Sequence, residues 1–207
     1  MKERGMIFNE EMVRALLDGR KTQTRRIVSE RHLNLIDVGS QIGECYPLEC
    51  GVDHANSQSY YREHCPFGIV GDRIWVRETF GDCGVRLAYR ADTDDGAKCK
   101  VNRWTPSIHM PRWASRLTLE ITGIRVDRLN GISEANAEAE GIDMEALADS
   151  QDCYDCIADH NMTGRPTAKG AFKYLWESIY GEENWQANPW VWVIEFKVVP
   201  NVQDNPA

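Results

Sequence analysis

The chain has 207 residues, a formal net charge of −8 and a hydrophobic content of 42%. This length fits one domain, and the apolar content is high enough for a packed core, which excludes a wholly disordered chain. The acidic balance argues against a module that binds nucleic acid through a broad basic surface, while a local basic groove stays compatible with it. We expect a single domain over residues 1–200 and a flexible tail at 201–207.

The cysteines and the N-terminal segment set the expected compartment. The N-terminus has no apolar signal core, and no run of the sequence is long enough to cross a bilayer, so we predict a cytoplasmic protein without a membrane partner. The seven cysteines fit thiols in a reducing compartment better than a disulfide framework. Cys153 and Cys156 have zinc-ligand spacing but no matching second pair, and we predict neither a metal site nor another cofactor.

The first helix is predicted directly after Asn9, a residue type that caps helix N-termini. An apolar stripe at helical spacing follows, and it comprises Met12, Val13, Leu16 and Leu17. Gly19 ends the helix, and the basic stretch of residues 20–26 begins there. We expect this stretch to form a turn held by a packed helix, which is a suitable place for a functional site.

Two stretches lack a clear period and are predicted to be insertions. The first covers residues from about 28 to 68 and the second covers 143–167. We expect the first to be a mobile surface segment that contains a short strand at most.

A strand is predicted over residues 73–80, which alternate in type and are rich in β-formers. Its even positions share one face, and they are Ile74, Val76, Glu78 and Phe80. Glu78 is then a carboxylate in line with core residues.

The remaining predicted elements complete an α+β pattern. Strands are expected over 85–90, 117–126 and 190–199, and helices after Ser133 and over 171–179. The apolar residues change from odd to even positions after Gly123, which predicts a bulge there. The last strand has the composition of a core strand. Few helices, several curved strands and long connections indicate a small mixed or antiparallel β-barrel with flanking helices.

The segment 104–113 contains two prolines and is predicted to be an ordered loop, because proline excludes a regular helix or a central strand. His109, Arg112 and Trp113 in this loop are candidate substrate-binding residues. The tryptophan would stack on a base, and the arginine would contact a polar edge or a phosphate. The alternative is a packed loop whose aromatic residues serve packing only.

Two short motifs lie at the basic stretch and at the first predicted strand. The first comprises Gly19, Lys21, Thr24 and Arg25 or Arg26, and the second runs from Gly71-Asp72 to Val76-Arg77-Glu78. Both resemble the signatures of the ASCH family (activating signal cointegrator homology), and the likeness covers most of the chain apart from the insertions. The segment Pro-Ser-Ile-His-Met-Pro-Arg-Trp is similar to one in phage and prophage members. The resemblance implies a PUA-like β-barrel.

The resemblance also implies an activity and its residues. Some ASCH proteins are small amidohydrolases that remove the acyl group from N(4)-acetylcytidine with a Lys, Thr and Glu triad. The motif match assigns this triad to Lys21, Thr24 and Glu78, while Arg25 and Arg26 become substrate-binding candidates. The implied function is deacylation of N(4)-acylated cytidine or cytosine, with a nucleoside as substrate. The alternative is a module that binds RNA or a modified nucleobase without catalysis.

Physical chemistry makes the implied triad coherent. A threonine hydroxyl attacks only when a base takes its proton, and Lys21 acts as such a base only when desolvation or nearby positive charge lowers its pKa. One helical or type I turn would place Lys21 and Thr24 on the same side. Burial would raise the pKa of Glu78 so that it can protonate the leaving amine. In a second variant Glu78 and Lys21 activate water, and Thr24 only hydrogen-bonds the substrate.

Other interpretations stay open. Lys21 and Glu78 can instead form a buried ion pair that fastens the motif to the barrel, and the basic cluster can be a solvated turn. A phage-type accessory protein that acts through host proteins is a third class of function. The sequence does not fix the oligomeric state.

Overall fold

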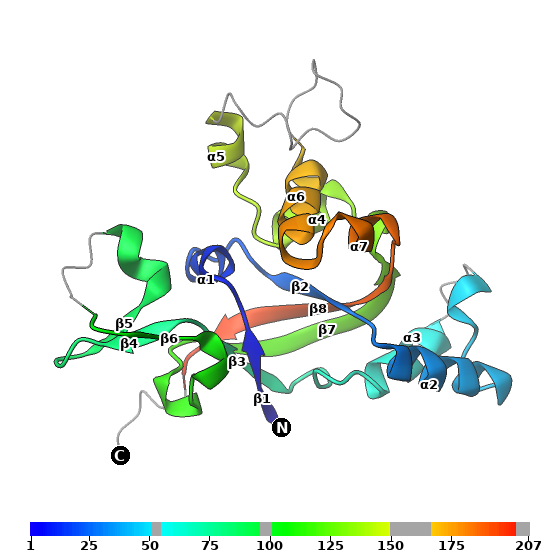
Figure 1. The fold of residues 1–207 in the computed structure, drawn as a ribbon. Coiled ribbons are helices and arrows are strands. Elements are labelled where there is room, and N and C mark those ends of the chain that lie inside the picture. Colours follow the sequence, from blue (N-terminus) through cyan, green and yellow to red (C-terminus); the bar gives the residue numbers. More distant parts are fainter. Residues whose placement is uncertain (51–54, 96–100, 150–166, 202–207) are drawn as a thin grey trace.

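The structure is a computed structural model that describes residues 1–50, 55–95, 101–149 and 167–201. Its centre is a five-stranded mixed sheet with the strand order β1-β3-β7-β8-β2 (Figure 1). The strands are β1 (Glu3–Ile7), β2 (Gln23–Ile27), β3 (Arg73–Arg77), β7 (Thr118–Arg128) and β8 (Trp190–Val199). β1 pairs with β3 in parallel, and the other pairs are antiparallel.

The two edge strands of this sheet are β1 and β2, and they approach each other without a backbone ladder between them in the described part of the chain. A side chain connects them, because Arg26 Nη2 donates a hydrogen bond to the carbonyl oxygen of Ile7 at 3.0 Å. The prediction of a mixed sheet is therefore confirmed. The hydrogen-bonded strands form an open sheet with a seam between β1 and β2. The predicted closed barrel would require a further backbone ladder between these two strands.

A smaller sheet lies beside the first and has the strand order β5-β4-β6. Its antiparallel strands are β4 (Phe80–Asp82), β5 (Leu87–Tyr89) and β6 (Trp104–Thr105). The proline segment leaves β6 through two single 3₁₀ turns, Ser107–His109 and Arg112–Ala114, each of which begins directly after a proline. The predicted ordered loop is thus confirmed. Met110 and Ala114 pack against Phe80 in a small core of their own.

The helices lie at three places around the large sheet (Figure 1). They are α1 (Glu10–Leu17), α2 (Glu30–Gln41), α3 (Ala55–Glu63), α4 (Glu134–Ala139), α5 (Met144–Asp149), α6 (Ala168–Tyr180) and α7 (Glu182–Gln186). α6 contacts both α4 and α7, and α3 contacts β7. In the described part of the chain, no helix has the length and apolar character that crossing a bilayer requires.

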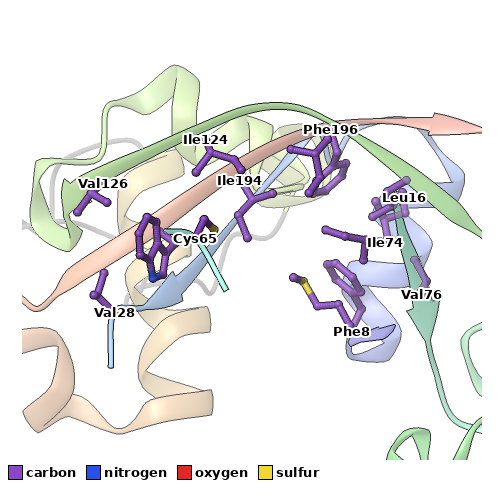
Figure 2. Packing of buried hydrophobic residues seen from close by; sticks show 14 of the residues in the cluster. Phe8, Leu16, Val28, Cys65, Ile74, Val76, Ile124, Val126, Ile194 and Phe196 are labelled. Carbon is purple, nitrogen blue, oxygen red and sulfur yellow. The ribbon is translucent and has the colours of Figure 1, made fainter. Parts of the chain in front are cut away.

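β8 separates two hydrophobic cores because its alternate side chains point to opposite faces. Trp192, Ile194 and Phe196 belong to the larger core, whereas Val191 and Val193 belong to a second core under α4, α6 and α7. Figure 2 shows side chains of β7, β8 and β3, among them Ile124, Ile194 and Ile74, pointing into the larger core. The predicted central position of this strand is confirmed.

Local sequence signals account for several element boundaries. The side chain of Asn9 accepts a hydrogen bond from the backbone N–H of Met12 at 2.8 Å, as a helix N-cap does. The burial of residues 73–80 alternates as predicted, with the even positions buried. The register of β7 against β8 shifts between Ile121 and Gly123, which confirms the predicted bulge.

Three sequence predictions are wrong. Residues 28–68 contain the helices α2 and α3 in place of a short strand, and Ile36 and Tyr61 from this segment are buried in the larger core. β1 and β2 were not predicted at all. Cys83 is disulfide-bonded, so the prediction of thiols fails at this residue.

Some predictions fall outside the part that the structure describes. Of the predicted insertion 143–167, residues 143–149 are described and hold α5, while 150–166 lie outside the described residues. Cys153 and Cys156 are in that gap. The predicted tail begins with Asn201, whose side-chain amide donates a hydrogen bond to the Ser115 carbonyl at 2.6 Å, and residues 202–207 lie outside the described part.

Candidate functional site

Residues 23–26 of the basic stretch belong to β2, and Lys21 just before it forms an isolated β-bridge with Glu140. This extended backbone determines which side chains meet. Neighbouring side chains of a strand point to opposite faces, so Lys21 and Arg25 share one side while Thr24 and Arg26 share the other. The contacts agree, because Arg26 Nη1 donates to Thr24 Oγ1 at 3.0 Å, whereas Lys21 and Arg25 share a carboxylate partner. The prediction that one turn places Lys21 and Thr24 on the same side is therefore wrong.

The shared partner is Glu140, which directly follows α4. Lys21 Nζ donates to Glu140 Oε2 at 2.8 Å and to the Glu140 main-chain oxygen at 2.7 Å. Arg25 Nη1 donates to the other carboxylate oxygen at 2.9 Å. The three side chains are 0%, 1% and 2% exposed, so one carboxylate holds two cations in the protein interior. We call these three residues the Glu140 cluster.

The local sequence around α4 fixes where Glu140 lies. Ser133 caps the helix by accepting a hydrogen bond from the Asn136 N–H at 3.2 Å. Gly141 has a φ of 100°, and a Cβ there would lie 2.7 Å from Ala15 Cβ and 3.0 Å from Lys21 Cβ. A glycine is therefore required for the helix to end so close to Lys21.

Burial changes the acid–base behaviour of Lys21. Desolvation is the largest effect, and it lowers the pKa of the ammonium group from its ordinary value. Glu140 acts in the opposite direction by charge and hydrogen bonding, and the positive charges of Arg26 and Arg25 add to the lowering. This is the direction that a lysine base requires.

A pocket of 450 Å³ lies at the seam between β1 and β2. Thr24, Arg25, Arg26 and Glu140 line one part of it, together with Gly5 to Ile7 of β1 and Arg77 at the end of β3. α6 provides an apolar wall of Phe172, Leu175, Trp176, Ile179 and Tyr180. Glu140 and Arg25 of the Glu140 cluster thus line one cavity together with Thr24 and an aromatic surface.

The aromatic wall is a connected set of rings. The centroids of Trp176 and Tyr180 are 4.4 Å apart, and those of Phe172 and Trp176 are 6.0 Å apart. Trp176 Nε1 donates to Asn184 Oδ1 at 2.9 Å, which fixes the orientation of the indole. Arg25 lies over the Phe172 ring at 5.8 Å. Such a wall can accept a flat ring by stacking or edge contacts.

Glu78 lies in a different environment from Lys21. Its carboxylate accepts two hydrogen bonds from Arg116, at 2.9 Å and 3.0 Å, and Arg116 also binds Asp92 at 2.8 Å. The Tyr89 ring stacks under the same guanidinium at 4.1 Å. Burial raises the pKa of Glu78 above its ordinary value, and Arg116 opposes that shift. Glu78, Arg116 and Asp92 form what we call the Glu78 cluster.

The predicted ion pair between Lys21 and Glu78 is not the arrangement found, because each residue has its own partner of opposite charge. Glu78 and Lys21 are also absent from the residues that line the seam pocket in the described part of the chain. The structure therefore brings Thr24, Arg25 and Arg26 together at one cavity. Lys21 does not line this cavity but contacts Glu140, which does.

The proline segment contacts the N-terminal strand and the sheet. Arg112 donates to Glu3 at 3.0 Å and to Thr118 and Asn201 at 3.2 Å each. Trp113 is 65% exposed, and His109 is exposed as well. Among the described residues, these three predicted binding residues do not line the seam pocket.

Sequence reasoning missed Glu140, Arg77 and the aromatic residues of α6 as site residues. The only local signal for Glu140 was its place between a predicted helix and Gly141. The aromatic residues were recognised as an apolar helix face, which does not tell a core surface from a pocket wall. In the described part of the chain, no group of three or more His, Cys, Asp or Glu residues is arranged to hold a metal ion.

The sequence matches no protein-family model, and no curated protein is significantly similar to it. A solved structure, the ASCH domain from Lactobacillus crispatus JV V101, is similar over 97% of this chain and 81% of its own, with 15% identity and a TM-score of 0.41.

Proposed function

We propose that the protein is an amidohydrolase that removes the acyl group from N(4)-acylated cytidine or cytosine in the seam pocket. The observation that carries the proposal is the meeting of Thr24 and Glu140 with the aromatic wall of α6 in one cavity. The motif likeness of Lys21 and Thr24 to ASCH amidohydrolases supplies the reaction class.

The pocket suits a small heteroaromatic ligand. Its 450 Å³ falls within the range of small-molecule sites, about 300–1,000 Å³. A pyrimidine ring would stack against Trp176 or Tyr180, and its polar edge would face Thr24 and Glu140. The ring needs no metal or organic cofactor for this mode of binding.

The geometry favours a route in which water is the nucleophile. Arg26 already donates to the Thr24 oxygen, and this leaves the threonine hydroxyl able to donate its hydrogen to the acyl oxygen of the substrate. Glu140 would take a proton from water, and the hydroxide would add to the acyl carbon. The carbon–nitrogen bond would then break as Glu140 gives that proton to the leaving amine nitrogen. The products are cytidine and a carboxylic acid.

Lys21 would act through Glu140 in this route. Its ammonium donates a hydrogen bond to Glu140 Oε2 at 2.8 Å and so orients the carboxylate toward the attacking water. Lys21 is therefore proposed as a positioning residue, and Glu140 takes the role that the sequence motif assigned to Glu78.

The test is release of cytidine from N(4)-acetylcytidine by purified protein. We expect Glu140→Gln and Thr24→Val to lower kcat/KM by about 10²–10⁴-fold, because each removes a group that acts on the reacting atoms. Glu138→Gln is the matched control, since Glu138 is exposed on the same helix and should keep full activity. Circular dichroism would establish that each variant is folded.

The role of Glu78 is decided in the same assay. If Glu78→Gln in folded protein abolishes turnover while Glu140→Gln does not, the assignment to Glu140 is wrong and the motif assignment holds. If the folded wild type releases no cytidine from any N(4)-acylated substrate, the enzyme proposal fails. Ring binding without turnover would then identify a module that binds a modified nucleobase.

A further inference from the structure

In the described part of the chain, the lining of the seam pocket holds more arginines than carboxylates. Arg25, Arg26 and Arg77 line this pocket together with one carboxylate, Glu140. Arg25 already shares that carboxylate with Lys21. Arg26 and Arg77 have only uncharged hydrogen-bond acceptors among the described residues.

Arg26 and Arg77 donate to neutral oxygens in every hydrogen bond that they make within the described residues. Arg26 binds Thr24 Oγ1, the Arg25 carbonyl and the Ile7 carbonyl, each at 3.0 Å. Arg77 binds the carbonyl oxygens of Ser107 and Ile108. Neither has a carboxylate within ion-pair distance among those residues, so both guanidinium charges remain available to an anion.

Both arginines adjoin β1. Arg77 is the register partner of Ile7, and its carbonyl accepts the Phe8 N–H at 3.1 Å. Arg26 reaches the Ile7 carbonyl from the opposite edge of the seam. Both side chains line the seam pocket, Arg26 from the β2 side of the seam and Arg77 from the β3 side.

Gly5 allows the side chain of Arg77 to lie against β1. A Cβ at Gly5 would lie 2.6 Å from the Trp75 ring and 2.8 Å from Arg77 Cδ, which is closer than real Cβ contacts. Arg77 also stacks on the Trp75 ring at 5.3 Å. The side chain of Arg77 thus lies directly along the backbone of β1 at the pocket rim.

A neighbouring cavity provides an internal comparison. It measures 680 Å³ and shares Met12, Glu140 and Leu175 with the seam pocket. Its lining contains Glu11, Asp18, Glu140 and Asp143 against Arg14 and Arg20, so carboxylates dominate there. An anionic group would be repelled from that cavity and attracted to the Arg26 and Arg77 side of the seam pocket.

We propose that Arg26 and Arg77 form a phosphate subsite, so that the preferred ligand of the seam pocket is a pyrimidine mononucleotide and not a free nucleoside. The pyrimidine ring would lie against the apolar side chains of α6. The 5′-phosphate would contact Arg26 and Arg77 beside β1. The net charge of −8 opposes a long polyanion, which favours a mononucleotide over RNA. This inference rests on the proposed pocket but does not require hydrolysis.

The test is calorimetric titration of the full-length protein with cytidine 5′-monophosphate and with cytidine. We expect the monophosphate to bind about 10- to 100-fold more tightly, as a charge-assisted contact of two arginines with phosphate would give. In Arg77→Gln the ratio of the affinity for the monophosphate to that for cytidine should fall at least fivefold. In Arg77→Lys the ratio should lie between that of Arg77→Gln and that of wild type, because lysine keeps the charge but lacks the paired N–H donors of a guanidinium. Arg73→Gln, on the same face of β3, is the matched control and should keep the wild-type ratio.

Equal affinities in wild type, an unchanged ratio in folded Arg77→Gln, or no binding of either compound would overturn the subsite. A cytidine-containing oligoribonucleotide that binds in an Arg77-dependent way when the monophosphate does not would assign the charge to RNA instead. The two proposals fail separately. Tight, Arg77-dependent monophosphate binding without deacylation contradicts only the enzyme, and deacylation with equal kcat/KM for the N(4)-acetyl nucleoside and its 5′-monophosphate contradicts only the subsite.

Discussion

Two three-residue ionic clusters with opposite charge balance occupy different regions of the molecule. In the Glu140 cluster one carboxylate holds a lysine and an arginine, and all three side chains are at most 2% exposed. In the Glu78 cluster one arginine holds two carboxylates, and the side chains of Arg116 and Asp92 are 23% and 34% exposed. Only the first cluster lines the seam pocket, through Glu140 and Arg25.

This difference separates a structural requirement from a chemical one. Glu78 connects the β3–β4 junction to the segment before β7, and its arginine keeps contact with water. Glu140 connects the end of α4 to the β2 region through Lys21 and Arg25, and it lines a cavity. Under the proposed function, the motif glutamate fastens the fold and Glu140, which lies outside the motif, acts at the site.

The largest expected effect on stability comes from removing the carboxylate at the centre of the buried Glu140 cluster. Glu140→Ala would leave Lys21 and Arg25 without their carboxylate, and we expect a loss of about 3–5 kcal/mol in the free energy of unfolding. Urea denaturation with Glu138→Ala as a control would measure it. A loss below about 1 kcal/mol would mean that water reaches both cations and that the cluster is not buried in solution.

The equivalent change in the second cluster should cost less. Glu78→Ala leaves Arg116 with Asp92 and with access to water, so we expect a loss of about 1–3 kcal/mol in the same denaturation experiment. A loss as large as that of Glu140→Ala would contradict the distinction between the two clusters.

A smaller, pH-dependent effect should come from Glu78. Its pKa is raised in the folded protein, so the folded state binds the proton more tightly than the unfolded state does. The resulting stabilisation is fully present below the ordinary pKa of 4.5 and is lost as the pH rises through the raised value. The unfolding free energy of wild type minus that of Glu78→Gln should therefore decrease as the pH rises from 4 to 7. A difference that increases over this range would mean that Arg116 outweighs burial.

The smallest effect is expected away from both clusters. Trp113 is 65% exposed and lies outside the lining of the seam pocket, so Trp113→Ala should change stability by no more than about 0.5 kcal/mol. Cytidine 5′-monophosphate should bind this variant within twofold of wild type by calorimetry. A larger loss of affinity would restore the sequence-based assignment of Trp113 to ligand binding.

Much of the fold was predictable because local patterns are strong in particular places. The alternation from Ile74 to Phe80, the apolar strand from Trp190 to Val199 and the parity switch at Gly123 each reflect a repeating contact with the core. β2 escaped prediction because its residues, Gln-Thr-Arg-Arg-Ile, have no strand-like alternation. It is a strand because β8 pairs with it.

The site was predictable only in part for a related reason. The motif identified Lys21, Thr24, Arg25 and Arg26, which are neighbours in sequence. Glu140 is 119 positions from Lys21, and one sequence contains no signal that connects the two. The buried partner of a charged residue is fixed by tertiary packing, and sequence spacing does not reveal it.

The parallel pairing of β1 with β3 and the position of α6 have a consequence for biosynthesis. The seam pocket takes its first lining residue from Gly5 and its last from Tyr180, so nearly the whole chain must be made and folded before the cavity exists. Contacts of such long sequence separation form late in folding. A ligand of this pocket would therefore bind and protect only the completed domain, and its binding would report the fraction of chains that have reached the native state.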